Sequence, residues 1–202
     1  MIRDLTKIEI KQMLEKHIWR QECPVDLSRL KKVEITHVDF QGKQNQGHLV
    51  VLDVLAKNVE QLFNEILSIQ FPIQQIKTIE DFDGDDVRSM KANNSSAFNG
   101  RLVARTNRWS SHAYGAAIDI NPIQNPYLLL NVQMELQEVI PVEGEGYVNR
   151  TILRKGMVEE VVAILAKHGF TEWGGSWIEK PDYHHFQLPW KEIWEFFPQN
   201  EE

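Results

Sequence analysis

The sequence predicts one compact domain in which helices pack against a small antiparallel sheet. Three observations predict this class. The chain has 202 residues, of which 42% are hydrophobic, and a chain of that size can bury a single sizeable core. Two β-rich segments, 33–40 and 48–54, flank a turn-like stretch and indicate a hairpin. Apolar residues then recur at helical spacing from Val59 to Ile66, which predicts a helix with one face on that sheet.

The predicted elements follow one another without a linker, repeat or low-complexity tract. Asp, Asn, Ser and Gly crowd residues 81–100, which predicts a long functional or disordered loop. Gly169 is placed to end a helix in the left-handed conformation. In chain order we expect a short helix over 5–19, the hairpin strands over 33–40 and 48–54, a helix from Asn58 to Phe71, a strand over 76–79, strands over 101–104 and 117–120, a helix over 158–165, a strand that carries His185, and a helix over 190–197.

Composition and charge exclude several classes of function. The chain carries 22 basic and 29 acidic residues, a net charge of −7, which argues against a nucleic-acid surface because phosphate binding requires clustered Lys and Arg. Cys23 is the single cysteine, so an intrachain disulfide is excluded and the redox compartment stays open. The first 21 residues mix apolar and charged side chains, without the apolar segment of a signal peptide or transmembrane helix. Cellular location is therefore left unassigned.

Two histidines and a carboxylate form a candidate zinc site. His112 and Asp119 lie in SSHAYGAAIDIN, and His185 lies in DYHHF. Catalytic zinc is usually held by three N or O side chains with a fourth position open to water, whereas a structural site closed by thiolates needs several cysteines. A loop ligand at His112 and a strand ligand at Asp119 can converge on one ion, and Gly115 keeps the intervening space small. We therefore expect one Zn²⁺ ion.

Each of these residues also has an ordinary structural interpretation. His112 alone is more often a hydrogen-bonded histidine in a polar loop, and Asp119 alone a turn or cap residue. Strand alternation places His184 and His185 on opposite faces, so we expect one of the two to bind metal. Asp182 lies three residues before His185, where its carboxylate can accept a proton from water and return it to a leaving amine. Its alternative is a surface aspartate after Pro181.

Four further side chains are candidates for contacts with the substrate or with the ligands. Arg101 is suited to a substrate carboxylate or an oxyanion, and equally to an ion pair with Asp85 or Asp86. Ser110 is a candidate hydrogen-bond partner for a metal ligand. Trp173 and Trp177, with two glycines between them, are candidates for one wall of a substrate cleft, and ordinary packing is as well supported.

At these residues the chain resembles the zinc D-alanyl-D-alanine carboxypeptidases related to the vancomycin-resistance peptidases. The pattern Ser-x-His-x-x-Gly-x-Ala-x-Asp is met by residues 110–119, and acid-x-x-His by residues 182–185. The likeness extends over about residues 33–187 through DDVRSM, NNSSAFNGR, DINPIQNPY and WGGSW, which resemble the branch of phage endolysin L-alanyl-D-glutamate peptidases. The acid is aspartate, one methylene shorter than the glutamate expected in the vancomycin-resistance enzymes.

The resemblance implies a fold, a ligand set and an activity. It implies the small α+β fold shared with the Hedgehog signalling domain, zinc on His112, Asp119 and His185, Asp182 as general base, and Arg101 as a transition-state contact. We divide the chain into an N-terminal helical extension, 1–32, and a zinc peptidase domain, 33–202. The expected activity is hydrolysis of a peptidoglycan stem peptide by a monomer. The alternatives are a non-catalytic zinc-containing module that binds wall peptides and an amidase that cuts sugar from peptide, and the bond cleaved stays open.

Overall fold

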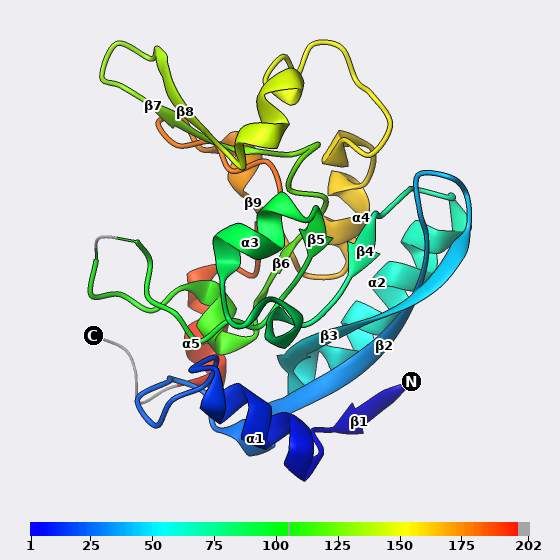
Figure 1. Ribbon diagram of the computed structural model, residues 1–202, viewed down its shortest axis with the longest axis vertical. Coiled ribbons are helices and arrows are strands. Elements are labelled where there is room, and N and C mark those ends of the chain that lie inside the picture. The colour runs from blue at the N-terminus through cyan, green and yellow to red at the C-terminus, as the bar shows by residue number, and fades with distance from the viewer. Residues whose placement is uncertain (105, 198–202) are drawn as a thin grey trace.

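The computed structural model describes residues 1–104 and 106–197 of the chain. Within these residues the strands form two three-stranded sheets, β1-β2-β3 and β6-β10-β9, and two two-stranded pairs, β4-β5 and β7-β8. All pairs are antiparallel except β4-β5. Helices lie against these sheets (Figure 1). The predicted α+β class, with small antiparallel sheets and several helices, is confirmed.

The N-terminal sheet is built on the predicted hairpin. β2 (Leu30–Val38) and β3 (Gln44–Leu52) pair along their whole length, and β1 (Ile2–Asp4) adds to β2. The turn is shorter than expected because Asp39 accepts hydrogen bonds from two backbone N–H groups within it, so β3 begins at Gln44. Helix α2 (Ala56–Ser68) lies along one face of the hairpin (Figure 1) and buries the side chains of the predicted stripe, Val59, Leu62, Phe63 and Ile66.

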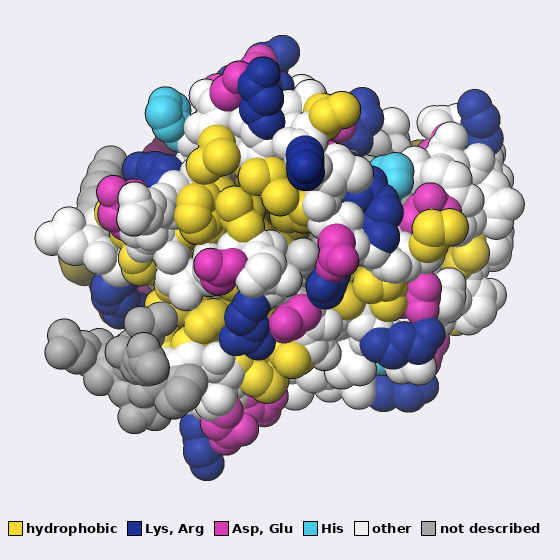
Figure 2. All heavy atoms as spheres, turned by 90° about the horizontal axis from the view of Figure 1, so that it is seen from below, with side chains coloured by type: hydrophobic (Ala, Val, Ile, Leu, Met, Phe, Trp, Pro, Cys, Tyr) yellow, Lys and Arg dark blue, Asp and Glu magenta, His cyan; other side chains and the backbone are white. Residues whose placement is uncertain are grey.

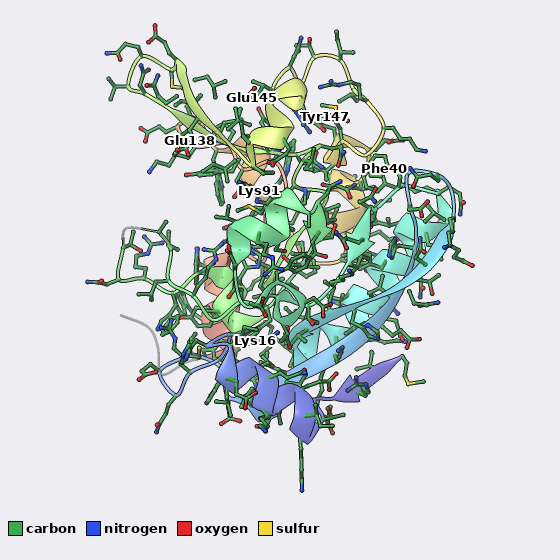
Figure 3. The ribbon with its side chains drawn as sticks, viewed as in Figure 1. Lys16, Phe40, Lys91, Glu138, Glu145 and Tyr147 are labelled. Carbon is green, nitrogen blue, oxygen red and sulfur yellow. The ribbon has the colours of Figure 1, made fainter. Side chains whose placement is uncertain are left out.

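The first thirty residues pack against the rest of the protein. Helix α1 (Lys7–Glu15) starts at Thr6, whose side chain and that of Glu9 cap each other's backbone N–H. Lys16, at the end of α1 (Figure 3), makes a 2.9 Å ion pair with Asp83. Met13 and other side chains before residue 33 also enter the common core. A domain boundary at residue 32 stays a prediction.

Residues 81–100 do not form the long loop that their composition predicts. They contain helix α3 (Asp86–Lys91), capped by the Asp85 side chain, and β5 (Asn94–Ser95), which pairs with β4 (Gln75–Ile76). The asparagine and serine side chains of this stretch are buried, and Asn94, for example, bonds both N–H and C=O of Lys77. The strand expected over 101–104 is also wrong: Val103 N–H bonds Arg108 C=O, and Leu102 makes an isolated bridge to Trp109.

The second three-stranded sheet is formed by the C-terminal half of the chain. It contains β6 (Ala117–Asp119), β10 (His185–Gln187) and β9 (Glu172–Trp173). The hairpin of β7 (Tyr127–Leu130) and β8 (Leu136–Ile140), which the sequence did not predict, projects from the body (Figure 1). Helix α4 (Val162–Lys167) ends near Gly169, whose φ of 97° confirms the predicted left-handed cap, and α5 (Trp190–Phe196) closes the described chain. Short 3-10 turns lie at Leu27–Arg29, Asp53–Leu55, Ile79–Phe82, Ser111–Tyr114, Val142–Tyr147, Val158–Glu160 and Gly174–Ser176.

One apolar core joins the two sheets. Its members come from β2, β3 and α2 on one side and from β6, β10 and α5 on the other. Gly156 has a φ of +85°, which favours glycine, and it lies against the ring of Phe40 at the tip of the first hairpin (Figure 3). On the face in Figure 2, acidic and basic side chains are interspersed around apolar ones. Among the described residues, no helix is both long and apolar enough to cross a bilayer.

Candidate metal centre

Three separate elements bring His112, Asp119 and His185 together. His112 lies in the 3-10 turn Ser111–Tyr114, Asp119 ends β6, and His185 begins β10 directly opposite Asp119. Gly115 ends the turn with a φ of +65°, and a Cβ there would come within 2.6 Å of the Leu52 backbone nitrogen. Only glycine fits this conformation and this close approach. The chain therefore turns sharply between its first two candidate ligands.

The three side chains have the geometry of a metal site. His112 Nε2 lies 3.1 Å from His185 Nδ1 and 3.2 Å from Asp119 Oδ2, and His185 Nδ1 lies 3.1 Å from Asp119 Oδ1. All three side chains are buried, with ligand atoms within 4.8 Å of one another. A zinc ion sits about 2.0–2.2 Å from N and O ligands, and ligand atoms at this spacing can share one ion at such distances. The residues fit zinc.

The second nitrogen of each imidazole is held by an acceptor. His112 Nδ1 donates to the Ala97 carbonyl oxygen at 2.5 Å, and His185 Nε2 donates to Gln187 Oε1 at 2.9 Å. Gln187 in turn donates to Glu172 at 2.7 Å. These bonds fix the tautomers so that Nε2 of His112 and Nδ1 of His185 face inward as lone-pair donors. Sequence reasoning missed these partners, although Gln187 shares a strand face with His185, two residues away.

Burial and charge shift the ionisation of the cluster. Burial opposes ionisation of Asp119, but the charges of the nearby His112 and His184 rings hold its pKa well below the usual range. Burial alone would lower the pKa of His112, yet the Asp119 carboxylate outweighs it and raises that pKa. Burial raises the pKa of Asp182, and the neighbouring His184 and His185 rings oppose that rise. A charged carboxylate thus lies among the ligands, and a second, more easily protonated carboxyl lies beside them.

Asp182 lines the same cavity as the three candidate ligands. This cavity, of about 620 Å³, is also lined by Arg101, Ser110 and Trp177, whereas Trp173 is not among its lining residues. Trp173 stacks on Phe186 at an interplanar angle of 11° and belongs to the packing around the core. Trp177 is 40% exposed, and its ring centroid lies 5.5 Å from that of His185. Trp177 therefore lines the cavity, whereas Trp173 packs against the core.

The structure identifies the ion-pair and hydrogen-bond partners of Arg101 and Ser110, which the sequence alone did not determine. Arg101 makes a 2.8 Å ion pair with Asp86 of α3, one of the two predicted alternatives, while its guanidinium still lines the cavity. The Ser110 hydroxyl accepts a hydrogen bond from the His112 backbone N–H at 3.3 Å and caps the 3-10 turn. It therefore fixes the backbone of a ligand, while Ala97 orients the ring.

Comparison with known proteins agrees with this geometry. Residues 104–188 match a protein-family model described as D-alanyl-D-alanine carboxypeptidase. The match spans less than half of the chain and includes His112, Asp119, Asp182 and His185, but not Arg101. It supports a peptidase and a metal centre on these residues. Searches of curated proteins and of solved structures found no significant match.

Proposed function

We propose that the protein is a zinc metallopeptidase that hydrolyses a peptide bond in peptidoglycan stem peptides. The observation that carries this proposal is the convergence of His112, Asp119 and His185, with ligand atoms within 4.8 Å, in a chain segment that matches the D-alanyl-D-alanine carboxypeptidase model. Two imidazoles and one carboxylate are a ligand set typical of hydrolytic zinc. We further propose that the enzyme acts as a monomer at the bacterial cell wall.

The chemistry divides between the ion and the side chains around it. Zinc held by these three residues would polarise the scissile carbonyl and acidify water. Asp182 takes a proton from the attacking water as the new C–O bond forms, and returns it to the leaving amine nitrogen as the C–N bond breaks. The raised pKa of Asp182 suits this task because a base with a pKa closer to the operating pH both accepts and returns a proton readily.

Arg101 and Trp177 are assigned to substrate contact. The Arg101 guanidinium lines the cavity while Asp86 holds one of its nitrogens, so its remaining donors can bind a developing oxyanion or a substrate carboxylate. Stem peptides carry free carboxylates close to both the L-alanyl-D-glutamate and the D-alanyl-D-alanine bonds. The exposed ring of Trp177 beside His185 provides an apolar wall for the peptide. These contacts fit either bond. Ser110 is assigned a supporting role, because its side chain caps the 3-10 turn that carries His112.

The test combines metal analysis with product analysis. Purified protein is expected to contain a single zinc ion per chain and to cleave defined stem peptides, with products identified by mass spectrometry. Product masses distinguish the D-alanyl-D-alanine bond, the L-alanyl-D-glutamate bond and the sugar–peptide bond of an amidase. Full activity in Asp182→Asn would remove the proposed mechanism. Glu179→Gln, an exposed carboxylate three residues upstream, is the matched control and should retain wild-type activity. Tight peptide binding without turnover would instead favour a binding module.

A further inference from the structure

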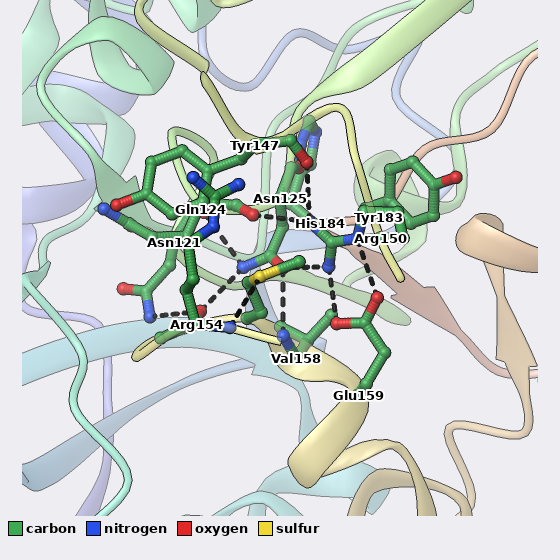
Figure 4. Close-up of polar contacts among 12 residues, drawn as sticks. Asn121, Gln124, Asn125, Tyr147, Arg150, Arg154, Val158, Glu159, Tyr183 and His184 are labelled. Atoms are coloured by element: carbon green, nitrogen blue, oxygen red, sulfur yellow. Dashed lines mark hydrogen bonds and ion pairs between the residues drawn. The ribbon is translucent and has the colours of Figure 1, made fainter. Parts of the chain in front are cut away.

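A largely buried arginine outside the cavity contacts the segment that carries Asp182. The side chain of Arg150 is 11% exposed and makes a two-pronged ion pair with Glu159, with N–O distances of 2.7 and 2.5 Å (Figure 4). Its guanidinium carbon lies 4.3 Å from the ring centroid of Tyr183. The same group donates to the carbonyl of Gln124 at 2.6 Å and to Asn125 Oδ1 at 2.9 Å. Neither Arg150 nor Glu159 lines the cavity.

Asn125 connects this ion pair to the residue that precedes His185. Its side chain is fully buried and donates to the carbonyls of Asn121 and Gly156, while its Oδ1 also accepts from Val158 N–H. Its own backbone carbonyl accepts a 2.8 Å hydrogen bond from His184 Nδ1 (Figure 4). Because every one of these bonds is buried, the position of the Asn125 carbonyl is closely fixed.

His184 then faces the carboxylate of Asp182. With Nδ1 bound to Asn125, its Nε2 lies 3.0 Å from Asp182 Oδ1, at ion-pair distance although without the alignment of a full hydrogen bond. The side chain of His184 is 4% exposed, so it has little freedom to turn away. Oδ1 of Asp182 is buried, which leaves Oδ2 as the oxygen that Asp182 presents to the cavity.

We propose that Arg150, acting through Asn125 and His184, is a positioning residue for the Asp182 carboxylate. The ion pair of Arg150 with Glu159 fixes Asn125, Asn125 fixes the His184 ring, and His184 holds Oδ1 so that Oδ2 faces the cavity. The role of Asp182 in turnover rests on the proposed function, whereas the orientation of its carboxylate does not. A paired, hydrogen-bonded guanidinium is the kind of buried charge that can hold such a geometry.

Two substitutions of His184 separate the two contacts of its ring. His184→Asn retains a donor near Nδ1, and so the bond to Asn125, but removes the group facing Asp182. His184→Gln places a donor near Nε2 instead. His184 lines the cavity beside Asp182, and we expect His184→Asn to lower kcat by about 10–100-fold, as for other residues that orient the groups of a site, with KM and zinc affinity within about threefold. His184→Gln should retain more activity. Equal kcat in His184→Asn and wild type, or lower kcat in His184→Gln than in His184→Asn, would overturn the proposal.

Two matched control positions, His37 and Arg154, show what the loss of a comparable side chain does elsewhere in the protein. His37 is also buried and bonds a carbonyl through Nδ1, that of Ile73 at 2.9 Å, but it belongs to β2. Arg154 is stacked over Tyr147 at 4.1 Å, as Arg150 is over Tyr183. We expect Arg150→Lys and Glu159→Gln to lower kcat by about 2- to 30-fold, the range for residues coupled through a packed network. His37→Asn and Arg154→Lys should leave kcat unchanged for the folded protein. Equal kcat in Arg150→Lys and Arg154→Lys would contradict the role of Arg150.

Crystal structures of the zinc-loaded wild type, His184→Asn and His184→Gln provide a measurement that does not depend on turnover. The Asp182 carboxylate is expected to rotate or to adopt several conformations in His184→Asn and to keep its wild-type orientation in His184→Gln. An unchanged carboxylate in His184→Asn would contradict the positioning role. If the wild type cleaves no stem peptide, the proposed function fails, while this comparison still decides whether His184 orients Asp182.

Discussion

The two sheets of this protein differ in what they bury. Among the described residues before Ser89, His37 and Glu80 are the only buried polar side chains, and β2, β3 and α2 pack through aliphatic and phenylalanine side chains. Between Ser89 and Gln187 the buried set includes asparagines, serines, glutamines and three histidines. Most of these bond backbone groups of irregular segments or one another. Both regions contribute apolar side chains to the common core, but the second region adds a set of buried hydrogen bonds that also orient the site.

This difference indicates how stability and chemistry are divided. Apolar burial is non-directional and tolerates small shifts, which suits a region that supplies free energy of folding. Buried hydrogen bonds are directional, and a lost partner is costly, which suits a region that must hold three ligand atoms within 4.8 Å. Substitutions in the two regions should therefore have separable effects on stability and on metal binding.

The largest expected effect is loss of the metal centre in His112→Ala. Removing one of three ligands should abolish tight zinc binding and lower peptidase activity by about 10³-fold or more, because the ion supplies several kcal/mol of transition-state stabilisation. Zinc affinity is measured by competition with a chelator, activity by product mass, and folding by circular dichroism. His37→Ala, a buried histidine of the first region, should lose stability and retain zinc. Full zinc content in folded His112→Ala would disprove the ligand assignment.

Next in size is the effect of Leu62→Ala in helix α2. The side chain is fully buried, and the substitution should lower the free energy of unfolding by about 2–5 kcal/mol through lost burial and a cavity. Activity per folded molecule and zinc affinity should not change, since the change lies in the first region. Urea unfolding measures the stability. Peptidase assays at a single substrate concentration measure the activity. Ile69→Ala, at an exposed position, should cost less than about 0.5 kcal/mol. A large loss of zinc affinity in folded Leu62→Ala would show that the regions are coupled.

The same contrast explains which parts of the fold the sequence predicted. In the hairpin and α2, alternation and the 3.6-residue stripe follow burial directly, so residues such as Leu62 and Val50 were assigned correctly. In residues 81–100 the prediction was wrong because Asn93, Asn94, Ser95 and Ser96 resemble a solvated loop in composition, yet all four are buried. Composition cannot distinguish a polar side chain that binds water from one that binds buried backbone.

The candidate site was predictable in part for a related reason. His112, Asp119 and His185 form a recognisable chemical set with characteristic spacing, and the structure brings them together. Their partners Ala97 and Gln187 carry no such signal, because a carbonyl oxygen or an amide becomes a partner only through the fold. The contact between His184 and Asn125 likewise joins residues 59 positions apart. Trp173 was a candidate for the cleft wall together with Trp177, with ordinary packing as its alternative, and its ring stacks on Phe186.

A smaller effect is expected from Glu9→Gln, a charged contact within the first region. Glu9 accepts hydrogen bonds from Arg3, Lys32 and Thr6, and the Arg3 guanidinium holds the pKa of Glu9 far below its usual range. The loss should be about 1–3 kcal/mol near pH 7, as for hydrogen bonds to charged groups. Because the pKa is depressed in the folded state, this stabilisation is complete above the unfolded-state pKa of about 4.3 and declines as the pH falls toward the folded-state value.

Urea unfolding at neutral and acidic pH tests this dependence. The difference in unfolding free energy between wild type and Glu9→Gln should shrink from about pH 7 to about pH 3. Glu15→Gln, an exposed residue of the same helix whose side chain is 61% exposed in its ion pair with Lys11, should change stability little at either pH. A difference between wild type and Glu9→Gln that grows toward acid pH would contradict the depressed pKa.

The smallest expected effect concerns Trp177, which belongs to the second region but supports neither a ligand nor Asp182 through a hydrogen bond. Its ring is 40% exposed and borders the cavity beside His185. Trp177→Ala should raise KM by about fivefold, equivalent to about 1 kcal/mol of lost aromatic contact, and leave zinc affinity unchanged. Ile178→Ala, an adjacent side chain that is 76% exposed, should leave KM unchanged. Unaltered KM in Trp177→Ala would place the peptide elsewhere in the cavity, whereas a loss of zinc affinity would mean that the Trp177 ring also helps to hold His185.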